Sequence, residues 1–519
     1  MGVSTGEAYK RRLRDDRTVY YKGDRIEDVT THPATRELID THADLFDLQH
    51  DPEYEDRLTY ESPLSGERVS VFYRRPETVD DLVARREATR CWHERTGGYA
   101  ARLNDFLATG LMALAVSHEV FDADGHRRGD NVVRYYEYCR ENDLCLTHAL
   151  IDPQIDRSKG SSFRAEDDVE RPGALRKVGE TEDGIVVSGA RMLATLGPQA
   201  DELLLFPFGH YGEDEADEAL AFAVPVEADG LRLICRPSLS PNDARNHPLA
   251  SRLDEMDAFV VLDEVVVPDE RVFVDGDVDV ANAWRETAQP AFASHQTVTK
   301  DLVKAEFVFG VAVMLAESTG IDEYFHVQSK LGEIAEAANL LNAAVLAAER
   351  QATTYRDTDY LVPDYATLNA ALSNFADRYQ RFVQILKDLG GSGLVGVPAW
   401  EDLEADSPLG GDVATYFRGK DVDARERLGV QKLAFDIALS GFGGREELYE
   451  RFHVGGPMRV KANQYKGYPN TEEIKARVRR FGLDGADGRG GQSDAPGSQG
   501  DAPGGQDDAP DSRGDADRE

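Results

Sequence analysis

The sequence predicts an α+β fold in which a central antiparallel β-domain separates two mainly helical regions. In the first and last thirds of the chain, apolar residues recur at three- and four-residue spacing, which is the period of a helix with one buried face. In the middle third, short apolar runs alternate with turn residues, as in β-strands. We therefore place a helical domain at residues 1–145, a β-domain at 146–280 and a second helical domain at 281–483.

The N-terminal region begins with two short elements. Ser4 and Glu7 have the spacing of a capping box, which predicts that a short helix follows. Apolar residues at 19–21 and 25–26 flank Lys-Gly-Asp at 22–24, which predicts a small hairpin. From about residue 78 to 145 the pattern is mainly helical, and one apolar helix face is formed by Leu103, Phe106, Leu107, Leu111 and Leu114.

Short apolar runs mark the strands expected in the middle domain. They lie at residues 184–189, 203–206, 221–224 and 259–262. Turn residues separate them, including Pro225, Asp229-Gly230 and Pro241-Asn242. Runs of this length between turn residues predict the antiparallel strands of one β-domain.

The last third contains two long helical patterns. One apolar stripe comprises Val327, Leu331, Ile334, Ala338, Leu341, Val345 and Ala348. A second helix ends with Phe382, Ile385, Leu386 and Leu389, and Gly390-Gly391 closes it. The Gly-x-Gly-x-x-Gly match at 391–396 therefore follows a helix, whereas a dinucleotide fingerprint must follow a strand. We interpret it as a turn between helices, so no NADH-binding site is expected.

The charge balance excludes several classes of protein. The chain has 59 Lys and Arg residues against 96 Asp and Glu residues, a formal net charge of -37. A field of this sign repels nucleic acids and anionic membrane surfaces. Because acidic residues are spread along the whole chain, we expect adaptation to a salt-rich cytoplasm, where screening shortens the reach of self-repulsion. Residues 484–519 lack large apolar side chains, which predicts a disordered acidic tail.

The sequence gives no indication of a metal centre, a disulfide framework or a membrane segment. Its four cysteines form no Cys-x-x-Cys pair, and they are Cys91, Cys139, Cys145 and Cys235. The N-terminus has no apolar leader, and no run of about eighteen apolar residues occurs. We therefore expect a cytoplasmic protein.

Residues 144–157 carry polar side chains where the first helical domain meets the β-domain. Domain junctions are preferred places for ligand clefts. His148 can donate a hydrogen bond or move a proton near neutral pH, and Gln154 and Arg157 can hold a ring edge or a phosphate. A core histidine and a surface arginine explain the same spacing, so both interpretations stay open at this point.

Two further polar residues lie among apolar neighbours. Arg102 lies on a largely apolar helix face beside Phe106, and a partly buried arginine needs an anionic or carbonyl partner. Thr195 ends a predicted strand. A structural salt bridge and a threonine bonded to backbone are the alternatives to a ligand contact at these positions.

Five stretches have distinctive sequences. They are Asp-Val-Thr-Thr-His-Pro at 28–33, Leu-Thr-His-Ala-Leu at 146–150, Gly-Ala-Arg-Met-Leu-Ala-Thr at 189–195, His-Pro-Leu-Ala-Ser-Arg-Leu-Asp-Glu-Met-Asp at 247–257 and Gly-Gly-Arg-Glu-Glu-Leu-Tyr-Glu at 443–450. Together they resemble the two-component 4-hydroxyphenylacetate 3-hydroxylase family, from Thr5 to around Arg459. The resemblance implies an acyl-CoA-dehydrogenase-like fold and a homotetramer assembled through the C-terminal helices.

The resemblance also implies roles for individual residues. Arg102 and His148 are the implied catalytic residues, and Arg102, Phe106 and His148 the implied substrate contacts. The implied flavin contacts are Gln154, Ile155, Asp156, Arg157 and Thr195, with a C-terminal flavin-binding turn of Gly443, Gly444, Arg445 and Glu446. Family members often carry a tyrosine where this chain has Phe106. A hydrogen-bond donor to the substrate is therefore missing, and the identity of the phenol stays open.

The implied reaction is the ortho-hydroxylation of a phenol by reduced FAD and O2 through a flavin C4a-hydroperoxide. Because no NADH fingerprint is expected, the FADH2 must come from a separate NAD(P)H:flavin reductase. The protein must then orient the ring, stabilise developing phenolate charge and exclude water.

Two alternatives remain at the level of sequence. A 4-hydroxybutyryl-CoA dehydratase-like lyase of the same superfamily would need a [4Fe–4S] cluster held by three cysteines and a histidine. Cys91 is followed four positions later by Arg95, and His295 seven positions later by Leu302, so that ligand set is absent. The second alternative is a flavin-binding paralogue that has lost its chemistry.

Overall fold

The structure is a computed structural model that describes residues 2–123, 126–155, 173–207 and 209–482. Residues Met1–Gln464 form one compact unit and Tyr465–Glu519 a second, and each is described by itself. The predicted tail at 484–519 and two predicted flavin contacts, Asp156 and Arg157, lie outside the described residues.

The N-terminal region is mainly helical, as predicted. Its helices are α1 (Gly6–Arg12), α2 (Arg36–Leu48), α3 (Glu55–Leu58), α4 (Val79–Thr96), α5 (Asn104–Val116) and α6 (Arg128–Asn142). The predicted hairpin is confirmed and consists of β1 (Val19–Tyr21) and β2 (Asp24–Ile26). Two smaller antiparallel pairs are β3 (Thr59–Glu61) with β4 (Arg68–Ser70), and β5 (Asp122–Ala123) with β6 (His126–Arg127).

Two details of this region differ from the sequence prediction. Helix α1 is capped by Thr5, whose Oγ1 accepts a hydrogen bond from the Ala8 backbone N at 3.1 Å. The predicted cap, Ser4, instead donates its hydroxyl to the Asn142 carbonyl at 3.3 Å, so that prediction is wrong by one residue. Helix α5 is buried along its whole length and not on one face, because it packs against α6, α9 and β7 (Leu146–Ala149).

Two sheets form the middle of the chain. Their other strands are β8 (Arg176–Thr181), β9 (Gly184–Thr195), β10 (Glu202–Leu205), β11 (Leu220–Pro225), β12 (Leu231–Cys235), β13 (Asp257–Pro268) and β14 (Val272–Asp275). The larger sheet has the order β2-β1-β12-β13-β9-β8, and the smaller one β14-β11-β10-β7. Most neighbours are antiparallel, but β1–β12 and β7–β10 are parallel. The predicted antiparallel β-domain is thus confirmed for most strand pairs, and the two parallel pairs arise because long connections bring distant segments back in the same direction.

The C-terminal third returns to helices. They are α8 (Val278–Asn282), α9 (Gln289–Thr319), α10 (Phe325–Arg350), α11 (Tyr365–Gly390), α12 (Gly410–Tyr416), α13 (Ala424–Ala438), α14 (Gly441–Phe452), α15 (Pro457–Lys466) and, in the second unit, α16 (Thr471–Gly482), whereas the short helix α7 (Ala250–Leu253) lies between β12 and β13. A short hairpin of β15 (Thr353–Thr354) and β16 (Leu361–Val362) separates α10 from α11.

Two predictions about these helices are confirmed. The stripe that includes Val327, Ile334 and Leu341 is the buried side of α10, which packs against α9 and α11. The glycine-rich stretch forms a 3₁₀ turn directly after α11, beginning at Gly391 with φ +53°. Helix α10 is long and apolar enough to cross a membrane by length and composition alone, but its place in this bundle explains the same composition.

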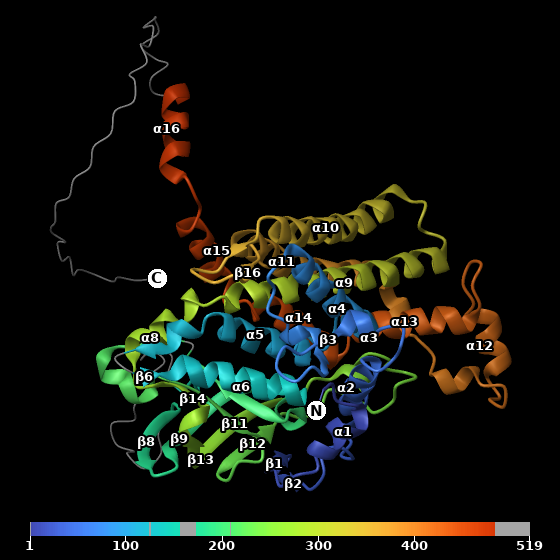
Figure 1. The fold of residues 1–519 in the computed structure, drawn as a ribbon. Helices are drawn as coiled ribbons and strands as arrows, with labels where there is room; N and C mark the ends of the chain where they lie inside the picture. Colours follow the sequence, from blue (N-terminus) through green and yellow to red (C-terminus); the bar gives the residue numbers. More distant parts are fainter. Residues whose placement is uncertain (1, 124–125, 156–172, 208, 483–519) are drawn as a thin grey trace, which may run out of the picture. The chain divides into compact units, whose positions relative to one another are not determined.

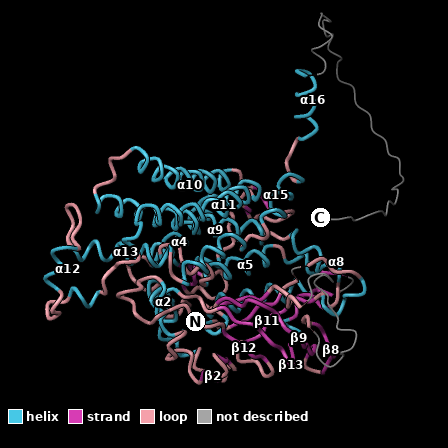
Figure 2. Tube along the Cα trace, turned by 180° about the vertical axis from the view of Figure 1, so that it is seen from behind, coloured by secondary structure: helices cyan, strands magenta, loops and turns pink. Residues whose placement is uncertain are grey.

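Figures 1 and 2 show how these elements are layered within the first unit. The strands of both sheets gather on one side, and α9, α10 and α11 lie on the other, with α5 and α6 between them. One apolar core fills the helical part and a second core fills the sheets. The start of α5 and strand β7 meet where the two parts join: the Leu146 backbone N donates to Asn104 Oδ1 at 3.1 Å. This junction positions the candidate site.

Candidate active site

Four side chains form the arginine corner, defined as Arg102 in the loop before α5, Phe106 on α5, His148 on β7 and Tyr449 on α14. The Arg102 guanidinium lies 3.8 Å from the centroid of the Phe106 ring and 5.2 Å from that of Tyr449. The Phe106 ring meets the His148 ring edge-on, with centroids 5.9 Å apart and planes at 79°. The structure therefore brings together the three residues predicted to contact the substrate.

Arg102 is held by its backbone, leaving its guanidinium for other contacts. Its backbone N donates to Glu255 Oε1 at 2.7 Å. Helix α5 begins at Asn104, so the predicted position of Arg102 on a helix face is wrong. The chain turns just before Arg102, where Ala100 has φ +58°, a left-handed conformation that a helix does not contain.

His148 lies on β7, opposite Leu204 of β10 in a parallel register. Burial lowers the pKa of His148 to about 3, and the positive charge of Arg102 lowers it further in the same direction. The imidazole is therefore neutral near pH 7. Among the described residues, none forms a hydrogen bond with its ring nitrogens, so both are available to a ligand.

Two polar atoms of the arginine corner are buried without a partner among the described residues. They are Arg102 Nη1 and Tyr449 Oη. A buried polar group without a hydrogen bond costs about 1–3 kcal/mol, and most native structures avoid that cost. Such atoms mark a place where a ligand completes the hydrogen bonding.

Behind the arginine corner lies a group of buried charges, here called the ion cluster. Its members are Glu255, Asp257, Lys300, Asp301, Lys304, Arg445, Glu446 and Glu450. Arg445 lies 2.8 Å from each of three carboxylates, those of Glu255, Asp257 and Glu446. Lys304 bridges Glu446 at 2.8 Å and Glu450 at 2.6 Å. The cluster thus ties α9 and α14 to the start of β13.

The ion cluster contains carboxyl groups whose pKa values shift in opposite directions: burial raises the pKa of Asp301 to about 7, although Lys300 beside it opposes the rise. Burial raises the pKa of Asp257, but Arg445 beside it outweighs burial, and the pKa is lowered to about 2. Asp301, Glu450 and His453 also offer ligand atoms within 4.8 Å of one another. The Lys300 ammonium lies 2.5 Å from Asp301 and 2.7 Å from Glu450, so a lysine already neutralises these carboxylates.

The predicted flavin contacts that the structure describes lie in three places. Thr195 ends β9 and donates its hydroxyl to Asp257 Oδ1 at 2.7 Å. Gln154 donates to the Asp152 carbonyl at 3.3 Å, and Ile155 follows it. Residues Gly443, Gly444, Arg445 and Glu446 lie within helix α14 and not in a turn, which corrects that part of the prediction.

The reason for the helix lies in its cap and its packing. The Gly443 backbone N donates to the capping hydroxyl of Ser440 at 3.0 Å. A Cβ on Gly443 would lie 2.2 Å from the Ile437 carbonyl, so glycine is required by the close approach of α13. The flavin-binding role of these four residues stays a prediction.

The residues present suit FAD. Segment 151–155 lies beside β9 through the bridge between Ile151 and Met192. Two apolar side chains of these segments are exposed, Ile155 to 59% and Leu193 to 52%. A flavin ring has apolar faces and polar edges, so the exposed apolar side chains of these segments suit its faces and the side-chain amide of Gln154 suits an edge.

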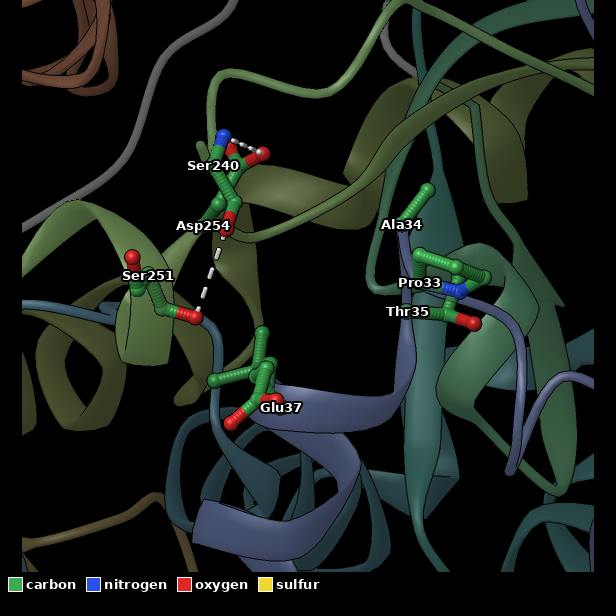
Figure 3. A pocket seen from close by; sticks show the side chains of 8 residues that line it. Pro33, Ala34, Thr35, Glu37, Ser240, Ser251 and Asp254 are labelled. Carbon is green, nitrogen blue, oxygen red and sulfur yellow. Dashed lines mark hydrogen bonds between the residues drawn. The ribbon is translucent and has the colours of Figure 1, made fainter. Parts of the chain in front are cut away.

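A hollow elsewhere on the surface does not have the size of a catalytic pocket. Figure 3 shows it between Pro33 and Ala34 on one side and Ser240, Ser251 and Asp254 on the other, with Glu37 below. Its volume is about 10 Å³, close to the room that one water molecule needs. Asp254 there accepts hydrogen bonds from the Ser240 backbone N and the Ser238 hydroxyl, which explains its burial.

Reasoning from the sequence missed Tyr449, Glu255 and the paired lysines of α9. The signal for Tyr449 was present, because Arg445, Tyr449 and His453 recur at four-residue spacing and so share one face of α14. Nothing in the local pattern indicates which residue of another element that face meets.

Comparison with known proteins gives consistent matches along the chain. Models of the 4-hydroxyphenylacetate 3-hydroxylase N-terminal and C-terminal regions match residues 5–274 and 280–482. The oxygenase component of 4-hydroxyphenylacetate 3-monooxygenase from Thermus thermophilus is 40% identical over 467 residues, which are 89% of this chain and 94% of that protein. The protein of the same description from Geobacillus sp. (strain PA-9) is 38% identical and covers 93% of this chain and 97% of its own length.

Solved structures agree with these matches. A crystal structure of the oxygenase component of 4-hydroxyphenylacetate 3-monooxygenase complexed with FAD and 4-hydroxyphenylacetate has a TM-score of 0.86 at 39% identity, covering 92% of this chain and 98% of that chain. An archaeal 4-hydroxybutyryl-CoA dehydratase has a TM-score of 0.81 at 21% identity, a likeness that shows the fold alone.

Proposed function

Because the chain belongs to the 4-hydroxyphenylacetate 3-hydroxylase family, we propose that it is the oxygenase component of a two-component, FAD-dependent monooxygenase. It hydroxylates a phenol at the carbon ortho to the hydroxyl group. The observation that carries this proposal is the arginine corner, where a cation, a neutral imidazole and aromatic rings meet beside unpartnered donors.

Arg102 stabilises negative charge on the phenol oxygen. A guanidinium remains charged at every relevant pH and can donate hydrogen bonds to an oxyanion. Its Nη1 has no partner among the described residues, and Glu255 fixes the backbone from which it extends. A preorganised donor of this kind needs no reorganisation when charge develops, which is why it lowers the barrier.

His148 acts on the phenol hydroxyl as a neutral imidazole. With a pKa near 3, one ring nitrogen accepts a hydrogen bond and the other donates one at neutral pH. The accepting nitrogen holds the hydroxyl proton while Arg102 favours the phenolate. The Phe106 ring, packed edge-on against His148, helps to fix the imidazole and excludes water from one side.

When bound, reduced FAD supplies two electrons to O2, so that one oxygen atom enters the ring and the other leaves as water. The residues proposed to hold it are Gln154, Ile155, Asp156, Arg157, Thr195, Gly443, Gly444, Arg445 and Glu446. Arg445 and Glu446 already pair within the ion cluster, so their contribution is to position α14. The reduced flavin comes from a separate NAD(P)H:flavin reductase.

Phe106 bears on which phenol is the substrate. Its ring fills the space under the Arg102 guanidinium and offers no hydroxyl to a ligand. We propose that the site selects phenols by ring packing and by the phenolate charge, without a hydrogen bond from this position. 4-Hydroxyphenylacetate is one member of that class to be tested.

The assembly and the location complete the proposal. Leu340 and Leu346 are exposed on α10 to 49% and 44% although the opposite side of this helix is buried in the bundle. We propose that this exposed face packs against further copies of the chain in a homotetramer. The net charge of -37 supports a salt-rich cytoplasm as the working environment.

The test is oxygen-dependent hydroxylation of a panel of phenols by the purified protein with FAD, NADH and a flavin reductase in molar KCl. Catechol formation that requires O2, reduced FAD and this protein is the expected result. Flavin binding without product from any phenol would favour a non-catalytic flavin-binding paralogue. Conversion of a 4-hydroxybutyryl-CoA ester would favour the lyase.

A further inference from the structure

Tyr449 occupies an unusual position on helix α14. Its ring stacks on that of His453, with centroids 4.6 Å apart and planes at 11°. Four cations surround the same ring: Arg102 lies 5.2 Å, Lys300 5.3 Å, Arg445 5.5 Å and Lys304 6.0 Å from its centroid. The ring is thus held on several sides, and its hydroxyl group has a defined place in a positively charged environment.

The hydroxyl of Tyr449 is buried and has no hydrogen-bond partner among the described residues. The same holds for Nη1 of Arg102. The two groups are close together, because the Arg102 guanidinium lies 5.2 Å from the centroid of the Tyr449 ring. Both can donate a hydrogen bond, and an arginine N–H can do nothing else. Two neighbouring donors without an acceptor call for a ligand oxygen.

Several hydroxyl and ammonium donors nearby already have partners. The hydroxyls of Tyr99 and Tyr379 lie 3.1 Å apart and bond to each other. Lys300 and Lys304 donate to Glu450 at 2.7 Å and 2.6 Å. Among the described residues near Tyr449, His453 Nε2 and carboxylate oxygens of Asp301 and Glu450 also lack a hydrogen-bond partner, but Arg102 Nη1 and Tyr449 Oη are the unpartnered donors that belong to the arginine corner.

Tyr449 is in the right protonation state to donate. Burial raises its pKa to about 12, although Arg102 and Lys300 oppose the rise. The hydroxyl keeps its proton near pH 7. Phe106, the other aromatic residue in contact with the Arg102 guanidinium, has no hydroxyl, so Tyr449 is the residue of the corner that can add an O–H donor to the guanidinium.

We propose that the Tyr449 hydroxyl and Arg102 Nη1 together bind the phenolate oxygen of the substrate, which makes Tyr449 a further catalytic residue. This inference rests on the proposed function, because it takes a phenol as the ligand. Two donors on one oxygen stabilise the phenolate relative to the phenol and so increase electron density at the ortho carbon. The phenol proton passes to solvent through His148, whose imidazole takes it on one ring nitrogen, releases one from the other and so stays neutral, while Tyr449 keeps its own proton.

The experiment compares Tyr449→Phe with Tyr99→Phe in the full-length protein. The first variant removes an unpartnered hydroxyl and keeps the ring that stacks on His453. The second removes a hydroxyl that is paired with Tyr379 in the same buried region. The first readout is the pKa of bound 4-nitrophenol, followed by its phenolate absorbance without turnover, and the second is kcat/KM for hydroxylation.

Tyr449→Phe is expected to raise the pKa of bound 4-nitrophenol by about one unit or more and to lower kcat/KM about tenfold or more, as for the loss of a hydrogen bond to a charged group. Tyr99→Phe is expected to lower the unfolding midpoint and leave both readouts unchanged. Unchanged readouts in Tyr449→Phe, or equal changes in both variants, would overturn the inference while the proposed function stands. A wild-type protein that neither binds 4-nitrophenol nor hydroxylates any phenol would refute the proposed function itself.

Discussion

The arginine corner and the ion cluster are neighbours that share the Glu255 carboxylate, but they differ in whether their polar groups have partners. One oxygen of Glu255 accepts the Arg102 backbone N, and the other pairs with Arg445. In the ion cluster each charged group has an opposite charge within 2.8 Å. In the arginine corner, donors of Arg102 and Tyr449 lack partners among the described residues.

The difference distinguishes charged groups that stabilise the fold from polar groups that are available to bind a ligand. Buried ions are costly unless paired, and a pair whose geometry is satisfied holds elements together but offers nothing to a ligand. A buried donor without a partner is costly for the protein alone and becomes favourable when a ligand arrives. Arg445 was predicted as a flavin contact, but its guanidinium is committed to Glu255, Asp257 and Glu446.

The largest effect should come from breaking the ion cluster. Arg445→Met leaves three carboxylates without their shared cation, and removing one partner from a buried pair costs about 3–5 kcal/mol in the free energy of unfolding. Urea unfolding measures this loss. Arg232→Met is the control, because Arg232 and Asp263 form an exposed pair worth about 1 kcal/mol or less. Equal unfolding midpoints for both variants would mean that the ion cluster does not stabilise the fold.

In the arginine corner, the substitution His148→Ala should lower the rate of hydroxylation and leave the free energy of unfolding nearly unchanged. We expect hydroxylation to fall about 10²-fold or more, which is the lower range for a positioned acid–base group, while FAD still binds. Product formation under O2 and flavin fluorescence measure the two properties. The exposed His326 of α10 provides the control substitution, His326→Ala. Unchanged turnover in His148→Ala would remove this residue from the mechanism.

Acid should weaken the fold through three buried histidines, and one of them belongs to the arginine corner. Burial lowers the pKa of His42, His148 and His453 to about 3 in each case. The unfolded chain binds these protons near pH 6.5. The contribution of the neutral histidines to the free energy of unfolding is therefore fully present above that pH and is lost as the pH falls toward 3. Each histidine contributes about 1.4 kcal/mol per pH unit in this window.

Urea midpoints at constant salt between about pH 7 and pH 5 test this expectation. The His148→Gln variant, which cannot take up the proton, should show a smaller slope than the wild type. A midpoint that does not change between these pH values would show that the buried histidines do not control acid stability.

The smallest change sharpens the role of Phe106. The Arg102 guanidinium lies 3.8 Å from the centroid of the Phe106 ring. Phe106→Tyr therefore adds a hydroxyl group close to this guanidinium. If 4-hydroxyphenylacetate binds with its phenol oxygen in the arginine corner, kcat/KM for it should rise by the value of one hydrogen bond, about 0.5–1.5 kcal/mol or roughly two- to tenfold. Steady-state kinetics with 4-hydroxyphenylacetate and with phenol measure the change. A fall for both substrates would indicate that the site has no room for the hydroxyl.

Much of the fold follows from periodicity. The spacing of Val327, Ile334 and Leu341 predicts a helix with one buried side, and α10 has that side. The Lys22-Gly23 turn predicts the β1–β2 hairpin for an equally local reason. The spacing does not predict where these elements go, such as the parallel pairing of β7 with β10 or the complete burial of α5. The spacing of apolar residues shows that an element has a buried face, but it does not show how many other elements pack against it.

The sequence by itself determined the order of helices and strands, the family, and the identity of Arg102 and His148 as candidates, because local spacing and motifs carry that information. Only the tertiary structure decided which charged groups are paired with other residues and which are left to bind a ligand. Arg102 and Glu255 are 153 positions apart, and Arg445 is 188 positions from Asp257, so no local pattern predicts their pairing. Whether a buried polar group is structural or reactive depends on its partners in space, and those partners exist only after the sheets and helices have packed.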